Sequence, residues 1–188
     1  MTKPAKEIQI LFVVETNASV KSDSAYIVWM LKKSFGDYIV PGGSDELFAH
    51  YDFVFMDGRQ NYKKRSVKSE IKSKSALFFK KKTHVVCCVD VDSQTSDDLQ
   101  AIAEIKRYTK DNGYHLVISY REIEDVIKAP SGSSKHERVK LFLKRYPKKE
   151  YVDDRQLSVP FDQVIGQIGA TNFNLVVGGI VDDEKTHL

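Results

Sequence analysis

The residues best suited to chemistry in this chain are two carboxylates at the end of one apolar segment. Residues 84–91 are mostly valine and cysteine, which favours a buried strand, and Asp90 and Asp92 stand at its end. Because alternate residues of a strand point the same way, the two side chains would leave it on one side, about 7 Å apart at roughly 3.3 Å per residue. Two negative charges this close repel each other unless a cation or a proton lies between them. The pair is therefore a candidate divalent-metal site, with an ordinary Asp turn after a strand as the alternative.

Three other segments are apolar and rich in β-branched or aromatic residues, which is typical of strands. They are 8–14, 51–56 and 115–118. Apolar residues at helical spacing follow each of the four strands, and Ser96 is the expected N-cap of the helix after the third. This alternation predicts an α/β fold with a mostly parallel, four-stranded sheet that is flanked by helices and has right-handed connections.

Most of the predicted strands are followed by acids. Glu15 follows the first strand and Asp57 the second, while Glu122 stands one turn beyond the fourth. Ligands bind outside the carboxyl ends of the strands in an open parallel sheet, so these acids and the Asp90/Asp92 pair would share one rim. We expect no basic residue within that rim, and a hard cation such as Mg²⁺ would relieve the repulsion.

A basic stretch separates the second and third strands. Ten Lys and Arg residues lie between positions 59 and 82, and Glu70 is the only acid among them. Part of the stretch is expected to be helical. Its basic side is either an ordinary solvated face or, because one sign of charge dominates, a surface for phosphate groups.

The last third of the sequence is less regular. We expect a loop at 130–134, a helix from about Lys135, a short amphipathic helix at 161–168 and a late strand at 173–177.

Composition narrows the class of protein. The chain of 188 residues is long enough for one domain with an elaboration, and its net charge of +3 is too mild to indicate nucleic acid by itself. Cys87 and Cys88 are neighbours in one strand and would point to opposite faces, which favours a role in the core over a disulfide. We see neither a signal peptide nor a membrane-spanning run, and we expect a cytoplasmic protein.

The order of these motifs resembles the Toprim family, the catalytic domain of topoisomerases, primases, several nucleases and RNA-maturing enzymes. Val13-Val14-Glu15 stands where that family has a strand ending in Glu, and Val89-Asp90-Val91-Asp92 where it has a strand ending in Asp-x-Asp. The resemblance covers roughly residues 7–128. It implies a Rossmann-like Toprim domain at 1–128 and a helical or mixed C-terminal extension at 129–188 that packs on it.

Within the family, the chain looks closest to the nuclease branch of OLD-type and RloB-like proteins from phage-defence loci. There a further acid begins the first helix, and a Ser/Glu element follows the fourth strand. Asp23 matches the first of these, and Ser119 with Glu122 the second, with Glu124 as a competitor. One position departs from the family pattern, because Thr16 stands where Gly usually follows the first Glu.

The resemblance implies Mg²⁺- or Mn²⁺-dependent phosphodiester cleavage in DNA or RNA. The implied catalytic residues are Glu15, Asp90 and Asp92. The implied metal ligands, for one ion or two, are Glu15, Asp23, Asp90, Asp92 and Glu122. The nucleic-acid backbone would bind to Lys63, Lys64, Arg65 and Lys68.

Two other classes stay open at this point. One is a catalytically silent Toprim-like module that binds nucleic acid or a protein partner. The other is a receiver-like or flavodoxin-like domain with Asp57 as phosphoacceptor, although its acid pair would then belong at the first strand. A protein partner or a homo-oligomer is compatible with each of them.

Overall fold

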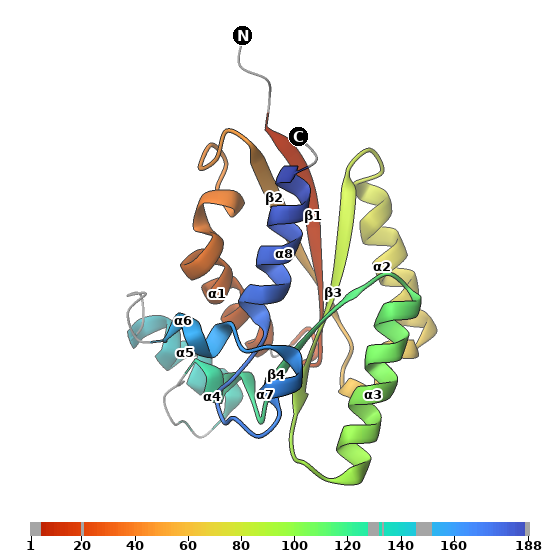
Figure 1. The fold of residues 1–188 in the computed structure, drawn as a ribbon, viewed down its shortest axis with the longest axis vertical. Coiled ribbons are helices and arrows are strands. Elements are labelled where there is room, and N and C mark those ends of the chain that lie inside the picture. The colour runs from red at the N-terminus through yellow and green to blue at the C-terminus, as the bar shows by residue number, and fades with distance from the viewer. Residues whose placement is uncertain (1–4, 20, 128–131, 133, 146–151, 187–188) are drawn as a thin grey trace.

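A four-stranded parallel sheet forms the middle of the computed structural model, which describes residues 5–19, 21–127, 132, 134–145 and 152–186 (Figure 1). The strands are β1 (Lys6–Val14), β2 (Leu47–Phe55), β3 (Lys82–Val91) and β4 (His115–Tyr120), in the order β2-β1-β3-β4. All three strand pairs are parallel. The predicted α/β class and the parallel four-stranded sheet are therefore confirmed, with β2 beginning four residues earlier than the sequence indicated.

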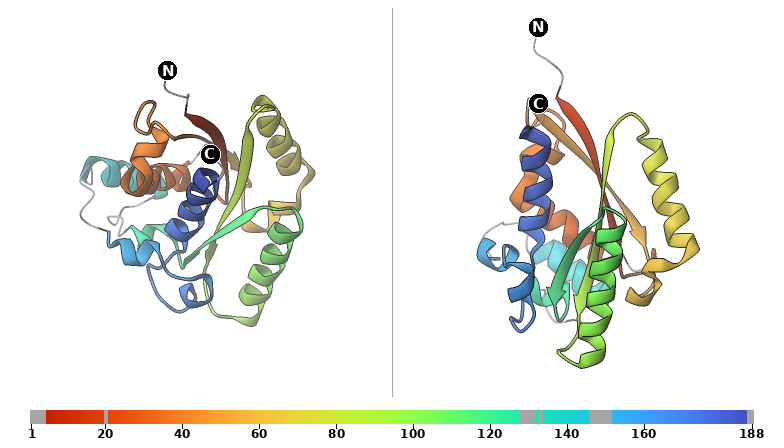
Figure 2. Two further views of the ribbon diagram at one scale, coloured as in Figure 1. Left: turned by 45° about the horizontal axis from the view of Figure 1, so that its top comes forward. Right: turned by 45° about the vertical axis from the view of Figure 1, so that its right-hand side comes forward.

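Helices cover both faces of the sheet (Figures 1 and 2). From β1 to β2 the chain steps toward one edge of the sheet, and from β2 to β3 and β4 it steps toward the other edge. Right-handed connections therefore put α1 (Ser22–Ile39) on one face and α2 (Arg65–Leu77) and α3 (Ser96–Asp111) on the other. A short 3₁₀ helix, η1 (Arg59–Lys63), precedes α2. This arrangement leaves room beside α1, which α8 (Phe173–Thr186) fills.

Two hydrophobic clusters, one on each face, make up the core. Phe12 of β1 packs with Tyr26 and Phe173 on the α1 and α8 side, while Val13 packs with Ile105 on the α2 and α3 side. Successive residues of β1 thus face opposite layers, which is why residues 10–14 are apolar without a break. Cys88 and Cys87 divide between the two clusters in the same way, and both are buried free thiols.

The predicted late strand at 173–177 is wrong, because these residues begin α8. Phe173, Val177, Ile180 and Val181 are buried, and their spacing is that of a helix rather than a strand. The place that a fifth strand would take beside β4 is filled by residues 170–172, through a single antiparallel bridge between Ser119 and Thr171 and through side chains. The Asn172 amide accepts the Ile118 N–H (2.8 Å) and donates to the Leu116 carbonyl (3.0 Å). The Thr171 hydroxyl donates to the Ile118 carbonyl at 2.7 Å.

Several helix limits also differ from those expected. α1 runs past Gly36 to Ile39 with a kink at Phe35, and the N-cap of α3 is Thr95, not Ser96. The short helices are α4 (Ile123–Val126), α6 (Asp154–Leu157) and α7 (Phe161–Val164), so the helix expected at 161–168 is shorter than predicted. α5 (Lys135–Arg145) matches the expected helix, whereas the loop expected at 130–134 and the boundary at residue 128 fall largely outside the described residues.

None of the helices within the described ranges is both long and apolar enough to cross a membrane.

Candidate functional site

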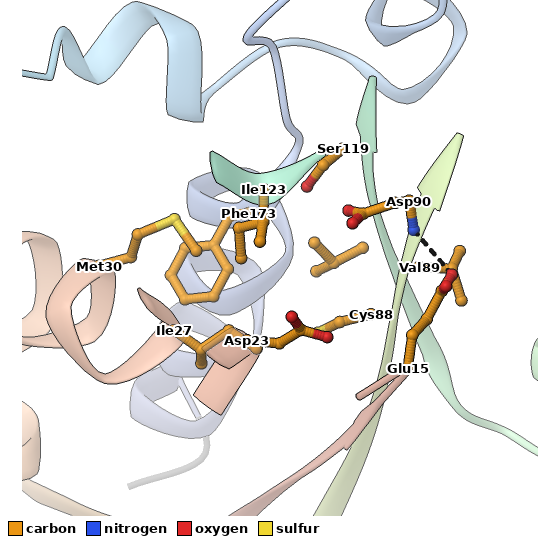
Figure 3. A pocket seen from close by; sticks show the side chains of 11 residues that line it. Glu15, Asp23, Ile27, Met30, Cys88, Val89, Asp90, Ser119, Ile123 and Phe173 are labelled. Atoms are coloured by element: carbon orange, nitrogen blue, oxygen red, sulfur yellow. Dashed lines mark hydrogen bonds between the residues drawn. The ribbon is translucent and has the colours of Figure 1, made fainter. Parts of the chain in front are cut away.

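Three carboxylates from three different elements line one pocket at the carboxyl ends of β1 and β3 (Figure 3). Glu15 follows β1, Asp23 lies in the first turn of α1, and Asp90 is the second-to-last residue of β3. Ser119 of β4 contributes a hydroxyl at the same pocket. Its apolar wall consists of Ile27, Met30, Cys88, Val89, Val117, Ile123 and Phe173. Three of the five predicted metal ligands are thus brought together.

Glu15 is held by an extension of the sheet ladder. Backbone pairing between β1 and β3 ends at Val14 and Cys88, and the N–H of Asp90 donates instead to Oε1 of Glu15 at 2.9 Å. The side chain of Glu15 therefore takes the place of the next backbone acceptor. This bond fixes Oε1 of the carboxylate, while the other oxygen, Oε2, takes no part in it.

Asp23 is held by the loop that follows Glu15. Its Oδ2 accepts the N–H of Thr16 at 3.1 Å, and its Oδ1 accepts the Ser22 hydroxyl at 3.2 Å. Lys21 adopts a left-handed backbone (φ 52°) just before α1, which turns the chain into the helix. Thr16 is thus engaged through its backbone N–H, while its hydroxyl is buried without a hydrogen-bond partner in the described part of the chain.

The environment of Glu15 raises its pKa to about 7. Burial is the main cause, and the negative charges of Asp23 and Asp92 add to it, while the Asp90 N–H and Arg59 act in the opposite direction. Near neutral pH the protonated and the ionised form of this carboxyl are therefore both well populated. A carboxyl with such a pKa is suited to proton transfer.

Arg59 lies at the same rim, which corrects the expectation that the rim holds no base. Its guanidinium donates to the Asp90 carbonyl at 2.7 Å and to Oδ1 of Asp98 at 2.6 Å, and it lies 3.7 Å from Oδ2 of Asp92. Sequence reasoning assigned Arg59 only to the basic stretch. The signal was available, because Arg59 follows the end of β2 by four residues and strand ends meet at this rim.

Asp92 and Glu122 are not brought into the pocket. The Asp92 side chain is 67% exposed and faces Arg59, and that of Glu122 is 43% exposed and lies 3.3 Å from Arg138. The competitor Glu124 is buried in α4 near Tyr26, whose pKa its charge helps to raise. Asp57 is exposed in a left-handed turn (φ 56°) after β2.

The donor chemistry of the pocket fits a hard divalent cation. Carboxylate and hydroxyl oxygens are the ligands that Mg²⁺ and Mn²⁺ prefer, and the negative charges of Asp23 and Asp92 contribute to the raised pKa of Glu15. As they lie, however, no three His, Cys, Asp or Glu side chains of the described residues are grouped closely enough to hold one metal ion. Side-chain rotation would have to accompany binding.

The predicted phosphate-binding residues lie at the start of α2 and just before it. Lys63, Lys64, Arg65 and Lys68 are all exposed. Two of them lie over aromatic rings, with the Lys63 Nζ 5.0 Å from the Tyr62 ring centroid and the Lys68 Nζ 5.5 Å from that of Tyr108. These contacts hold the two ammonium groups at the surface.

Fold and pocket together define an open, parallel α/β protein with an acidic pocket at the carboxyl ends of its strands. No protein-family model matches the chain, and a search of curated proteins found no match either.

Proposed function

We propose that this chain is a Toprim-like, Mg²⁺- or Mn²⁺-dependent phosphodiesterase that cleaves nucleic acid in the cytoplasm. The observation that carries the proposal is the convergence of Glu15, Asp23 and Asp90 on one pocket at the ends of β1 and β3. Exposed cations on α2 and the guanidinium of Arg59 at the rim give the complementary charge for a phosphate backbone.

In this proposal Asp23 and Asp90, with Glu15 as a further ligand, would hold the cation, which would polarise a phosphate oxygen and offset the charge of the transition state. Where Glu15 acts as the general acid/base instead of a ligand, Oε2 is the atom that takes a proton from the attacking water and returns it to the leaving oxygen, because Oε1 is fixed by the Asp90 N–H. Arg59, held by Asp98 and the Asp90 carbonyl, keeps a positive charge at the rim. Asp92 and Glu122, which face Arg59 and Arg138 outside the pocket, would have to turn toward it to hold a second ion.

A catalytically silent module that binds nucleic acid or a protein partner is the second candidate. Two observations favour it. No three acids in the described ranges stand ready to ligate one ion, and Thr16 occupies the position of the usual Gly.

Cleavage of single- and double-stranded DNA and RNA, with Mg²⁺, Mn²⁺ or EDTA, tests the proposal. We expect cleavage only with a divalent cation. Asp90→Asn keeps the shape of the side chain and should slow cleavage by about two orders of magnitude. Asp97→Asn removes an exposed acid of α3 outside the pocket and should leave the rate unchanged.

Cleavage that persists in EDTA or in Asp90→Asn would overturn this mechanism. Nucleic-acid binding without cleavage in any metal would instead favour the silent module.

A further inference from the structure

The solvent side of α2 carries a row of cations that begins near the acidic pocket. Arg65, Lys68 and Lys72 are exposed and spaced three and four residues apart, so they lie on one side of the helix. Lys63 and Lys64 extend the row toward η1 and Arg59. From Arg65 to Leu77 the helix rises by about 18 Å at 1.5 Å per residue, and it runs to the opposite end of the sheet (Figure 1).

These cations are not neutralised by the protein itself. Within the described residues, none of the following has a carboxylate within 4.0 Å: Lys63, Lys64, Arg65, Lys68, Lys72 and Lys80. The other basic residues of the stretch do pair: Arg59 with Asp98, Lys74 with Asp52, Lys81 with Glu7 and Lys82 with Glu184. The unpaired cations are therefore concentrated on the exposed row, where an anion from outside the chain can reach them.

An exposed aromatic ring stands at the far end of this row. In the turn after α2, Phe79 is 79% exposed and the preceding Leu77 is 80% exposed. The Lys80 Nζ lies 5.3 Å from the Phe79 ring centroid. The neighbouring Phe78, in contrast, packs its ring against His50, with the centroids 4.8 Å apart. Phe78 thus anchors the turn, and Phe79 is presented to solvent beside a cation.

The extent of the row distinguishes between two kinds of anionic partner. A helix that lies on a lipid surface inserts an apolar face into it. The apolar residues Val67 and Ile71 of α2 are instead buried against the sheet, and its exposed side carries charge, with Leu77 only at its end. A linear polyanion lying along the helix contacts every cation of the row and also reaches the ring.

We propose that the exposed side of α2 and the ring of Phe79 form a binding track for single-stranded nucleic acid. Lys64, Arg65, Lys68 and Lys72 bind successive phosphates, and Phe79 stacks on an unpaired base. A duplex also offers phosphates but covers its base faces, so only a single strand uses the aromatic end of the track. The choice of a nucleic acid as the polyanion rests on the proposed function, which the track deepens by naming the strandedness of the substrate.

Fluorescence anisotropy with a labelled single-stranded oligothymidine, recorded in EDTA, measures the track without cleavage. We expect Phe79→Ala to weaken binding about tenfold and to leave the salt dependence as it is. The double variant Lys68→Ala/Lys72→Ala should reduce the slope of log K against log salt by about 1.4, because each phosphate contact with a single strand contributes about 0.7. A duplex of the same length should bind more weakly and should not respond to Phe79→Ala.

The matched control is Lys140→Ala/Lys144→Ala. These lysines are exposed on α5, on the α1 side of the sheet (Figure 1), and their removal changes the net charge by the same amount. The control should bind like the wild type. Equal losses in both double variants, or an unchanged affinity of Phe79→Ala for the single strand, would overturn the track.

Two further outcomes separate this inference from the proposed function. Binding to vesicles rich in phosphatidylserine that depends on Phe79, without binding of the oligonucleotide, would replace the track with a lipid surface. Cleavage that continues unchanged in the track variants would leave the proposed function standing and contradict the track. Track-dependent binding without cleavage in any metal would contradict only the nuclease.

Discussion

Glu15 is the residue on which the chemistry of the acidic pocket depends most. It ends β1, replaces a backbone acceptor for the Asp90 N–H and lies among the charges of Asp23, Asp92 and Arg59. Burial and the two acids outweigh the guanidinium, and the pKa of Glu15 therefore rises to about 7. The same acid on an exposed turn would stay ionised at neutral pH and would be a weak base.

This pKa sets the direction of a pH dependence. Unfolded chain releases the Glu15 proton near pH 4.5 and folded chain near pH 7. The stability that the protonated side chain contributes is therefore full below pH 4.5 and is lost as the pH rises through 7. A divalent cation must displace the same proton, so its apparent affinity should be about tenfold higher at pH 8 than at pH 6.

Thermal unfolding with and without Mn²⁺ at these two pH values measures the effect. We expect a larger rise of Tm at pH 8 in the wild type and little difference between the two pH values in Glu15→Gln, which cannot ionise there. An equal rise at both pH values in the wild type would contradict the assigned pKa.

The start of α3 shows how one element positions the rim. Thr95 is its N-cap, with Oγ1 accepting the Asp98 N–H at 3.4 Å, and Asp98 in the first turn binds Arg59. Hydrogen bonds from Ser93 and then from Arg59 lower the pKa of Asp98, which keeps it ionised as the partner of the guanidinium. The first turn of α3 therefore also fixes the guanidinium of Arg59 beside β3.

Paired substitutions distinguish this cap from its neighbour. Thr95→Ala should lower the free energy of unfolding by about 1 kcal/mol, because a helix donor loses its acceptor. Ser96→Ala should change it by less than about 0.5 kcal/mol, since that exposed side chain does not cap the helix. Urea denaturation measures both, and the reverse order would show that Ser96 is the cap after all.

At the scale of the whole molecule, the C-terminal segment is part of the core. α8 packs beside α1, and the ring of Phe173 lies 6.2 Å from that of Phe12 in β1. At the other end of α8, the buried Glu184 pairs with Lys6, Lys82 and His84 from β1 and β3. Burial alone would raise the pKa of Glu184, but the lysine hydrogen bonds outweigh it and lower the pKa to about 2. α8 is thus held by apolar contacts near the pocket and by charge at the amino ends of the strands.

Two substitutions in α8 test its contribution to the core. Phe173→Ala should cost about 3–5 kcal/mol, because it removes a fully buried ring and leaves a cavity beside the pocket. Leu175→Ala, in the same helix but 48% exposed, should cost less than about 1 kcal/mol. Chemical denaturation gives both values. A small loss for Phe173→Ala would mean that α8 docks only loosely on the sheet.

Sequence periodicity was sufficient to predict the four-stranded parallel sheet and the α/β fold class. Apolar runs such as 8–14 and 85–91 are long enough to define strands buried on both faces, and the helical patterns between them require parallel connections. The same reasoning failed at 173–177, where β-branched residues suggested a strand. Side chains of Thr171 and Asn172 occupy the edge of β4 there, and short apolar runs do not distinguish a buried helix from a strand.

The amino-acid sequence by itself determined which acids end the strands, because strand ends and acid positions are local features. Only the tertiary structure decided which acids meet. Asp23 joins Glu15 and Asp90 because the Thr16 N–H draws the loop onto it, while Asp92 turns outward to Arg59. Both the low polarity around Glu15 and the guanidinium beside it come from segments distant in sequence. The pKa of a side chain and the charge balance of a site depend on such neighbours in space, and the spacing of residues along the chain does not reveal them.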